Sequence, residues 1–298
     1  MAVARPPAGD LVLIAMAVAA VSTSAPLIRE AQAPALAIAF WRNAMAVAVL
    51  APLCAVRRRD EISRLGRGPA GGALLAGALL SAHFAAWVPS LSFTTVASSV
   101  ALVATQPVWA ALLARARGDE VPAQAWWGIA LAVGGAVLLT GVDVALSGRA
   151  LIGDLLALAG GMLAAAYVTV GAEVRQSVST TLYTAICYSA AAVVLGLLCL
   201  TGGQALSGFD GRTWLCLLAL TAGPQFLGHS VVNRVLRTTS ATIVSVAILF
   251  EIVGSTLLAW VAFGETPPAG AYPAAVLIAG GIVLVVLAGR AAVPPAVD

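Results

Sequence analysis

The chain has 298 residues, of which 61% are hydrophobic and 10% are charged, and its formal net charge is +3. Because a soluble globular domain carries about 25% charged residues, this composition excludes a protein whose whole surface faces water. So small and dispersed a charge also excludes a nucleic-acid-binding surface. We therefore expect an all-α integral membrane protein.

Ten segments of the chain are long and apolar enough to cross a bilayer, which takes about 20 apolar residues. In chain order they are 10–29, 34–56, 69–89, 94–115, 122–140, 151–172, 178–200, 212–232, 241–262 and 269–289. The region 68–114 has no Asp, Glu or Arg and is too long for one span, so residues 89–95 divide it. Prolines within the spans, which remove a backbone donor and favour kinks, are Pro26, Pro52, Pro107 and Pro224. The ten segments leave no room for a soluble domain.

The arginines predict the orientation, because cytoplasmic loops carry an excess of basic residues. If the N-terminus is cytoplasmic, Arg29, Arg149 and Arg212 lie outside and Arg42 lies within the second span. The other twelve arginines then lie inside. We expect both termini to be cytoplasmic.

The two halves of the chain resemble each other. A shift of 146 residues aligns Gly134-Gly135 with Gly280-Gly281 and Asp119 with Glu265. It also aligns His83 with His229, the only two histidines of the protein. Each half holds five predicted spans, and five is odd, so the halves 1–145 and 146–298 should form two repeats of opposite orientation. Inverted repeats are typical of secondary transporters, whose substrate site lies at the repeat interface near the midplane.

Four ionisable side chains lie well inside the predicted spans: Arg42, His83, His229 and Glu251. Such groups cost about 2.5–3.5 kcal/mol each on insertion scales and usually mark functional pathways. Glu251 lies near the middle of the ninth span. It could carry a proton or bind a substrate ammonium group, or it could be the buried ion-pair partner of Arg42. The sequence leaves these readings open.

Other polar and aromatic side chains should face the same interior, because lipid offers no hydrogen bonds. Together with the two histidines and Glu251, these side chains are candidates to line a substrate-binding cavity. They are Trp87 in the third span, Thr105, Gln106 and Trp109 in the fourth, Tyr167 in the sixth, and Gln225 and Asn233 in the eighth. Gln225, His229 and Asn233 recur at every fourth residue and so share one helix face. Each residue could instead serve only in packing or in an interhelical hydrogen bond.

No metal or cofactor site is expected. The four cysteines, Cys54, Cys187, Cys199 and Cys216, lie within apolar runs and lack the close spacing of zinc or disulfide pairs. No phosphate-binding loop or zinc-type histidine motif is present, so transport driven by ATP on this chain alone is not expected.

The run from Gly223 to Glu265 resembles the second repeat of EamA-type carriers of the drug/metabolite transporter superfamily. The motif FWRN at 40–43, the run that starts at His83 and the pair Gly118-Asp119 are similar to the first repeat. This resemblance implies ten helices in two inverted repeats, a central cavity and alternating access. It also implies export of small metabolites, with amino acids, as in YddG-like exporters, a frequent substrate class. Many relatives have proline after the acid of the ninth span, whereas here Ile252 follows Glu251.

Our leading expectation is a secondary transporter that exports amino acids or related metabolites across a bacterial inner membrane. An efflux carrier for drugs or organic cations, a channel, and an integral membrane enzyme that uses His83, His229 and Glu251 are the alternatives. The inverted repeat disfavours the enzyme. The expected partners are a small-molecule substrate, the lipid bilayer and protons, without nucleic acid or an obligate protein partner.

Overall fold

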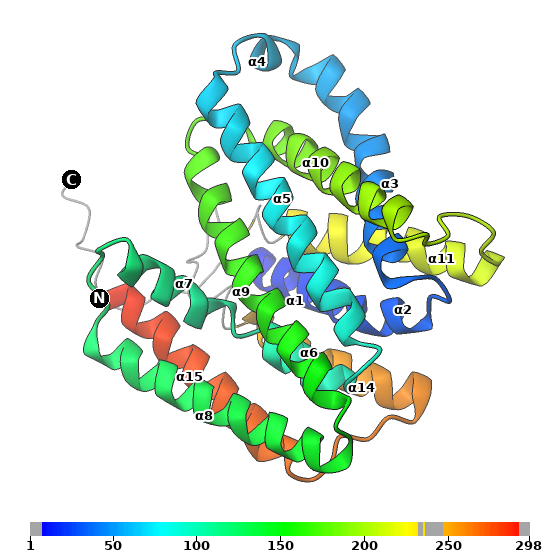
Figure 1. The fold of residues 1–298 in the computed structure, drawn as a ribbon. Coiled ribbons are helices and arrows are strands. Elements are labelled where there is room, and N and C mark those ends of the chain that lie inside the picture. Colours follow the sequence, from blue (N-terminus) through cyan, green and yellow to red (C-terminus); the bar gives the residue numbers. More distant parts are fainter. Residues whose placement is uncertain (1–7, 232–234, 236–246, 292–298) are drawn as a thin grey trace.

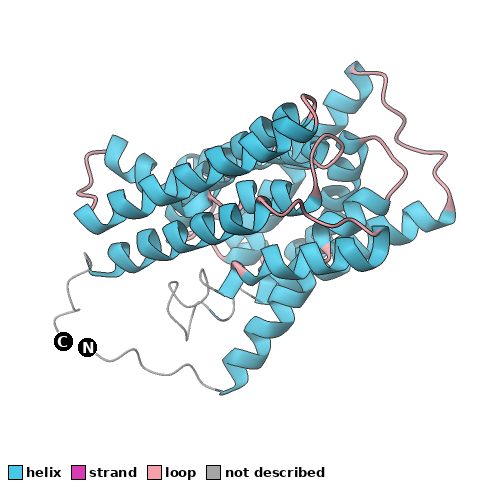
Figure 2. Cartoon of the chain, turned by 90° about the horizontal axis from the view of Figure 1, so that it is seen from below, coloured by secondary structure: helices cyan, strands magenta, loops and turns pink. Residues whose placement is uncertain are grey.

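The structure is a computed structural model that describes residues 8–231, 235 and 247–291. These residues form a bundle of helices (Figure 1), and the described part contains no strand (Figure 2). Eight of its helices are long and apolar enough to cross a membrane, and they correspond to the first seven predicted spans and the tenth. The all-helical, multi-pass prediction is therefore confirmed.

Most helices begin and end within a few residues of the predicted spans. The bounds are α1 (Ala8–Ser22), α2 (Ser24–Glu30), α3 (Ala35–Arg57), α4 (Arg59–Ser63), α5 (Arg67–Ser90), α6 (Val96–Val103), α7 (Gln106–Ala116), α8 (Ala123–Leu146), α9 (Ala150–Val174), α10 (Thr180–Thr201), α11 (Gly211–Leu220), the π-helix η1 (Thr221–Ser230), α14 (Phe250–Phe263) and α15 (Ala271–Ala291). The eighth predicted span corresponds to α11 and η1, and the ninth overlaps α14. Both predicted ranges include residues outside the described ones, so a total of exactly ten spans stays a prediction.

Three of the four prolines coincide with departures from a regular α-helix. The first predicted span is divided into α1 and α2 at Thr23, three residues before Pro26. The fourth predicted span is divided into α6 and α7 at Ala104 and Thr105, immediately before Pro107. The eighth changes from α-helix to π-helix at Thr221, three residues before Pro224. Proline cannot donate to the helix ladder, and its ring crowds the preceding turn, so the backbone ahead of it takes another geometry. Pro52, in contrast, lies inside the continuous helix α3.

Helix α8 is longer than predicted. The sequence indicated an end near residue 140, but the helix continues through Gly141 to Leu146 and ends at Ser147-Gly148. Asp143 is therefore inside the bundle and only 2% exposed. Asp154, near the start of α9, is fully buried. The prediction that only four ionisable groups lie within the spans was therefore wrong, because Asp143 and Asp154 lie there as well.

The two halves pack in corresponding ways. Helices α8 and α15, which the shift of 146 superposes, run side by side (Figure 1), and so do the equivalent helices α3 and α10. Helix α5 packs against α9, and its equivalent η1 packs against α1, the equivalent of α9. All of these contacts join one half to the other, and the contact of α5 with α9 is matched by that of η1 with α1.

Helices α8 and α15 approach each other at glycines. A Cβ on Gly135 would lie 2.8 Å from the Ile278 nitrogen, and one on Gly281 would lie 2.5 Å from the Ala132 nitrogen and from the Gly128 oxygen. Contacts this short between backbones leave no room for a side chain. The second glycine of each pair seen in the repeat, Gly135 and Gly281, thus lies where these two helices touch.

Candidate functional site

Arg42 lies at the centre of one group of predicted site residues. Its side chain comes from α3 and is only 1% exposed. Its Nε donates a hydrogen bond to Oε1 of Gln225 in η1 at 2.9 Å, and its guanidinium lies 4.4 Å from the ring centroid of Phe84. This arrangement holds a cation in the apolar interior by one hydrogen bond and one cation–π contact.

Glu251 lies within electrostatic reach of Arg42, as does Tyr188 of α10. The two charged groups do not, however, form one of the ion pairs that the described residues show. Glu251 is partly buried in the first turn of α14. The structure therefore places an acid and a base in one interior region without joining them directly.

Two hydrogen-bond donors in this group have no acceptor among the described residues. They are Nη1 of Arg42 and Nε2 of Gln225, both buried. A buried donor without a partner is costly, by about 1–3 kcal/mol and more when it is charged. A ligand carboxylate is an acceptor of the kind that these donors lack.

A second group gathers around Gly160 and Gly161 of α9. His83 Nδ1 lies 2.9 Å from the Gly160 oxygen, and the His83 ring stacks on Trp87 with centroids 5.7 Å apart. A Cβ on Gly161 would lie 3.3 Å from Oγ1 of Thr105, which accepts a hydrogen bond from Nε1 of Trp109 at 3.1 Å. Glycine at both positions lets the side chains from α5 and the α6–α7 break reach this face of α9.

The remaining predicted site residues are less closely connected. Gln106, at the start of α7, is partly buried. Tyr167 of α9 is also partly buried and lies beside Tyr183 and Tyr188 of α10. His229 belongs to η1, but its side chain lies outside the described part of the structure, and so does the whole of Asn233. The predicted stripe of three residues on the eighth span can therefore be followed only at Gln225.

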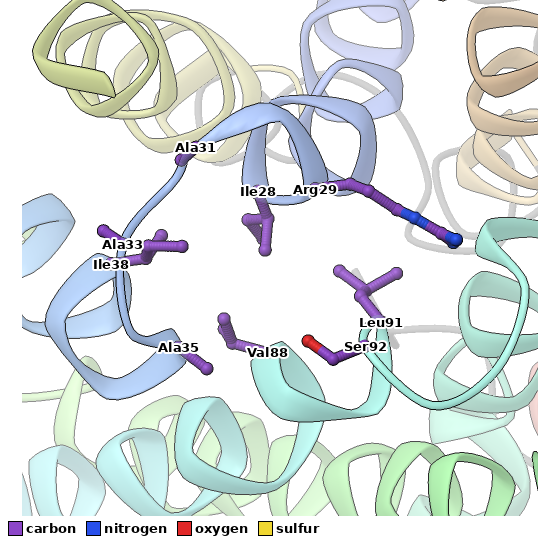
Figure 3. Close-up of a pocket in the computed structure, with 9 residues that line it drawn as sticks. All are labelled: Ile28, Arg29, Ala31, Ala33, Ala35, Ile38, Val88, Leu91 and Ser92. Atoms are coloured by element: carbon purple, nitrogen blue, oxygen red, sulfur yellow. The ribbon is translucent and has the colours of Figure 1, made fainter. Parts of the chain in front are cut away.

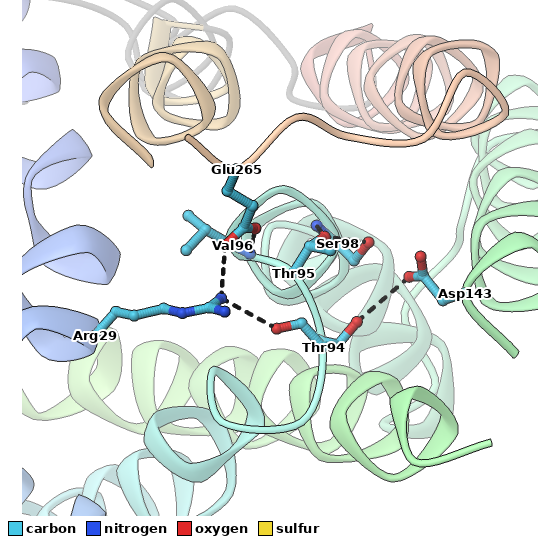
Figure 4. Close-up of polar contacts among 7 residues, drawn as sticks. All are labelled: Arg29, Thr94, Thr95, Val96, Ser98, Asp143 and Glu265. Atoms are coloured by element: carbon cyan, nitrogen blue, oxygen red, sulfur yellow. Dashed lines mark hydrogen bonds and ion pairs between the residues drawn. The ribbon is translucent and has the colours of Figure 1, made fainter. Parts of the chain in front are cut away.

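At one end of the bundle, Arg29 of α2 joins segments from both halves (Figure 4). Its Nη1 lies 2.8 Å from Oε2 of Glu265, in the connection from α14 to α15, and 3.4 Å from the Thr94 oxygen. Oε1 of Glu265 accepts a hydrogen bond of 2.6 Å from the N–H of Val96, the first residue of α6. We call this end of the bundle the Arg29 end.

A comparable contact lies at the opposite end, where α4 is located (Figure 1). Oε1 of Glu61 accepts a hydrogen bond of 2.6 Å from the N–H of Ser179, which caps α10. Desolvation opposes ionisation of the Glu61 carboxyl, but hydrogen bonds from Ser179 and the charge of Arg58 outweigh it and lower its pKa below the usual value. At each end, a glutamate of one half therefore holds the start of a helix in the other half.

The sequence model of the EamA-like transporter family matches residues 8–141 and again residues 151–287. The chain belongs to the EamA-like transporter family. Family members are transporters of the drug/metabolite transporter superfamily, so the chain is assigned to that class. The resemblance drawn from the sequence is confirmed at this level.

Among solved structures, one crystal structure is similar to this EamA-like chain with a TM-score of 0.65 and 19% sequence identity. The similarity covers 95% of this chain and 98% of the other. At this identity it shows a shared fold over almost the whole length. No curated protein matches the chain.

None of the predicted site residues lines the two pockets found in the described part of this EamA-like chain. One, of about 270 Å³, is at the Arg29 end and is lined by residues including Ile28, Arg29, Val88 and Ser92 (Figure 3). The other, of about 420 Å³, is mainly apolar and lies among α6, α8, α14 and α15, with Trp260 and Tyr272 in its wall. The first pocket lies beside the contact between Arg29 and Glu265.

Glu265 of this EamA-like chain provides a test of the Arg29 end. Glu265→Gln keeps an acceptor for the Val96 N–H but loses the charge that faces Arg29, so we expect the free energy of unfolding to fall by at most about 1 kcal/mol. Glu265→Ala removes both interactions and should lower it by about 2–3 kcal/mol. Thermal unfolding in detergent measures both values. Equal losses in the two variants would show that the hydrogen bond to Val96 contributes nothing.

Sequence reasoning missed Asp143 and Asp154 because each lies near a predicted span end, where acids are common. A usable signal exists nonetheless. Asp143 is the only charged residue of α8, and no basic residue stands a helical turn away that could pair with either acid. The structure brings the two together beside Thr94, which lies far from both in the sequence.

Proposed function

We propose that this chain is a secondary active transporter that exports amino acids or closely related metabolites by alternating access. One observation supports an amino acid as the substrate. Within the described part of the chain, the buried donors Arg42 Nη1 and Gln225 Nε2 have no acceptor, and Glu251 is an acid in the same region. A zwitterion complements this arrangement, since its carboxylate accepts from the donors and its ammonium group faces the acid. An organic cation would satisfy Glu251 but would be repelled by Arg42.

The rest of the proposal follows the repeat. Residues 1–145 form the first repeat and residues 146–298 the second, inverted repeat, with the substrate site between them. Ten spans place both termini on the same side of the membrane, and the arginine distribution favours the cytoplasm of a bacterial cell. The matching contacts of the two halves support this arrangement.

The test is counterflow into proteoliposomes preloaded with mixed unlabelled amino acids. We expect saturable uptake of a subset of labelled amino acids. Glu251→Gln should reduce it about 10-fold or more, because a neutral amide loses the attraction for an ammonium group, and 10-fold corresponds to about 1.4 kcal/mol.

The matched control is Glu120→Gln, which neutralises an exposed acid in the connection from α7 to α8. Uptake by this variant should equal that of the wild type. If wild-type liposomes take up labelled organic cations but no amino acid, the proposed substrate class is wrong. Equal uptake by the Glu251 variant and the wild type would remove Glu251 from the mechanism.

A further inference from the structure

Two buried carboxyl groups meet near the Arg29 end. Asp143 comes from the last turn of α8 and Asp154 from the second turn of α9; they are 2% and 0% exposed. Thr94 lies between the two helices. Its hydroxyl donates to Oδ2 of Asp143 at 3.4 Å (Figure 4), and its nitrogen would lie 2.8 Å from a Cβ on Gly153, next to Asp154. The close approach of the Thr94 turn to α9 thus brings both acids to one hydroxyl group.

Asp154 has no hydrogen-bond partner of good geometry in the part of the chain that the structure describes. Neither of its carboxylate oxygens receives a hydrogen bond from the described residues, although Thr94, Thr140 and Asp143 surround it. Ser98 lies beside Asp143. The environment of the two acids therefore consists of hydroxyl groups and of each other.

No basic side chain neutralises the two carboxyl groups, as neither belongs to an ion pair of the described residues. The two arginines that contact Phe93 and Thr94, in the turn beside the pair, have other partners. Arg149 lies over the ring of Phe93, with its guanidinium carbon 5.5 Å from the ring centroid. Arg29 lies against Glu265 and the Thr94 oxygen. Two negative charges here would repel each other across a region that excludes water.

We propose that Asp143 and Asp154 form a proton-binding site in which the two carboxyl groups share one proton. Two adjacent carboxylates in a low-dielectric site do not both ionise, because desolvation and mutual repulsion oppose the second charge. A shared proton also gives Asp154 the hydrogen bond that it otherwise lacks. The pair then titrates as a unit.

The site is connected to the contact that joins the two halves. Thr94 touches Asp143 through its hydroxyl and Arg29 through its backbone oxygen, and Arg29 in turn pairs with Glu265 (Figure 4). Loss of the shared proton leaves two repelling charges around Thr94. Their repulsion therefore bears on the contact between the Thr94 oxygen and Arg29. This step rests on the proposed transport function, with the added premise that a proton taken up at the Arg29 end moves inward as the substrate is exported.

Infrared spectroscopy of the full chain in lipid nanodiscs tests the site without any transport assay. A protonated carboxyl group absorbs apart from carboxylates and amides. We expect such a band at neutral pH, its loss at alkaline pH, and a shift when isotope-labelled aspartate is incorporated. The isotope shift distinguishes the pair from Glu251 in the folded wild-type protein. Absence of the band, or a band that labelled aspartate leaves in place, would overturn the proposal.

The variants refine this result. Asp143→Asn and Asp154→Asn should each abolish the aspartate band at neutral pH, because the remaining carboxyl group ionises once its charged neighbour is gone. Asp60→Asn, an exposed acid of α4, should retain the band. If Na⁺ removes the band from the wild type at neutral pH and raises its thermal stability, the pair holds a metal cation and not a proton. Retention of the band in both pair variants would also contradict the assignment.

Coupling is tested in the proteoliposomes used for counterflow. In the wild type, a pH gradient should accelerate substrate movement several-fold, and this acceleration should be lost in Asp154→Asn. If wild-type liposomes show no counterflow, the proposed function fails while the infrared result still decides the site. If counterflow is present and the variant retains the full response to the gradient, the connection from the site to transport is wrong.

Discussion

Gly135→Val and Gly281→Val are expected to lower the free energy of unfolding by about 3 kcal/mol, the upper part of the range for overpacked cores. At these positions a Cβ would lie 2.8 Å and 2.5 Å from backbone nitrogens of the facing helix. Backbone atoms cannot rotate away as a side chain can, so α8 and α15 must separate. Thermal unfolding in detergent, with size-exclusion chromatography to monitor aggregation, measures the loss.

The neighbouring glycines provide matched controls. Gly134 has no atom within 4 Å of a Cβ, and at Gly280 the nearest is a side-chain carbon of Leu131 at 3.6 Å. Gly134→Val and Gly280→Val introduce the same side chain into the same helices and should change stability by less than about 1 kcal/mol. Equal destabilisation by adjacent variants would contradict the assignment of the glycine requirement to the close approach of α8 and α15.

Arg42→Met should weaken the apparent affinity for an amino-acid substrate about 10- to 100-fold. A charged hydrogen bond contributes about 1.5–3 kcal/mol, and the variant removes the buried guanidinium that we expect to bind the substrate carboxylate. Arg42→Lys should retain little of the wild-type affinity, because a single ammonium group cannot contact Gln225, the Phe84 ring and a ligand together. Concentration-dependent counterflow separates this loss of affinity from a loss of maximal rate.

The control is Arg57→Met, at the exposed end of the same helix, which should leave affinity unchanged. Thermal unfolding of each variant checks that the protein is still folded. Wild-type affinity in a folded Arg42→Met protein would assign Arg42 a purely structural role, as the support of Gln225 and Glu251.

Several parts of the fold follow from local sequence. The helices α3, α5, α9 and α10 lie within a few residues of the predicted spans, because transfer into lipid depends on the summed hydropathy of about 20 consecutive residues. Charged loops and prolines interrupt that sum locally, so the break before Pro107 could be anticipated. The end of α8 could not, since a single acid at Asp143 looked like the edge of a span.

The candidate site was predicted less completely. Inward-facing polar residues could be named, because lipid leaves them no other partner. Their grouping could not: Arg42 contacts Gln225 and Phe84, whereas His83, Trp87 and Thr105 meet separately around α9. Which side chains meet depends on the rotation and crossing of helices far apart in sequence.

The sequence by itself determined that this protein lies in a membrane, that its halves are repeats and that it belongs with EamA-type carriers, because composition, periodicity and internal similarity are properties of the linear chain. Only the tertiary structure decided that Asp143 and Asp154 share Thr94, and that Arg42 lies against Gln225 and near Glu251 without an ion pair between the two charges. Such contacts join residues from about ten to more than two hundred positions apart, and the close packing of small residues between helices brings them together.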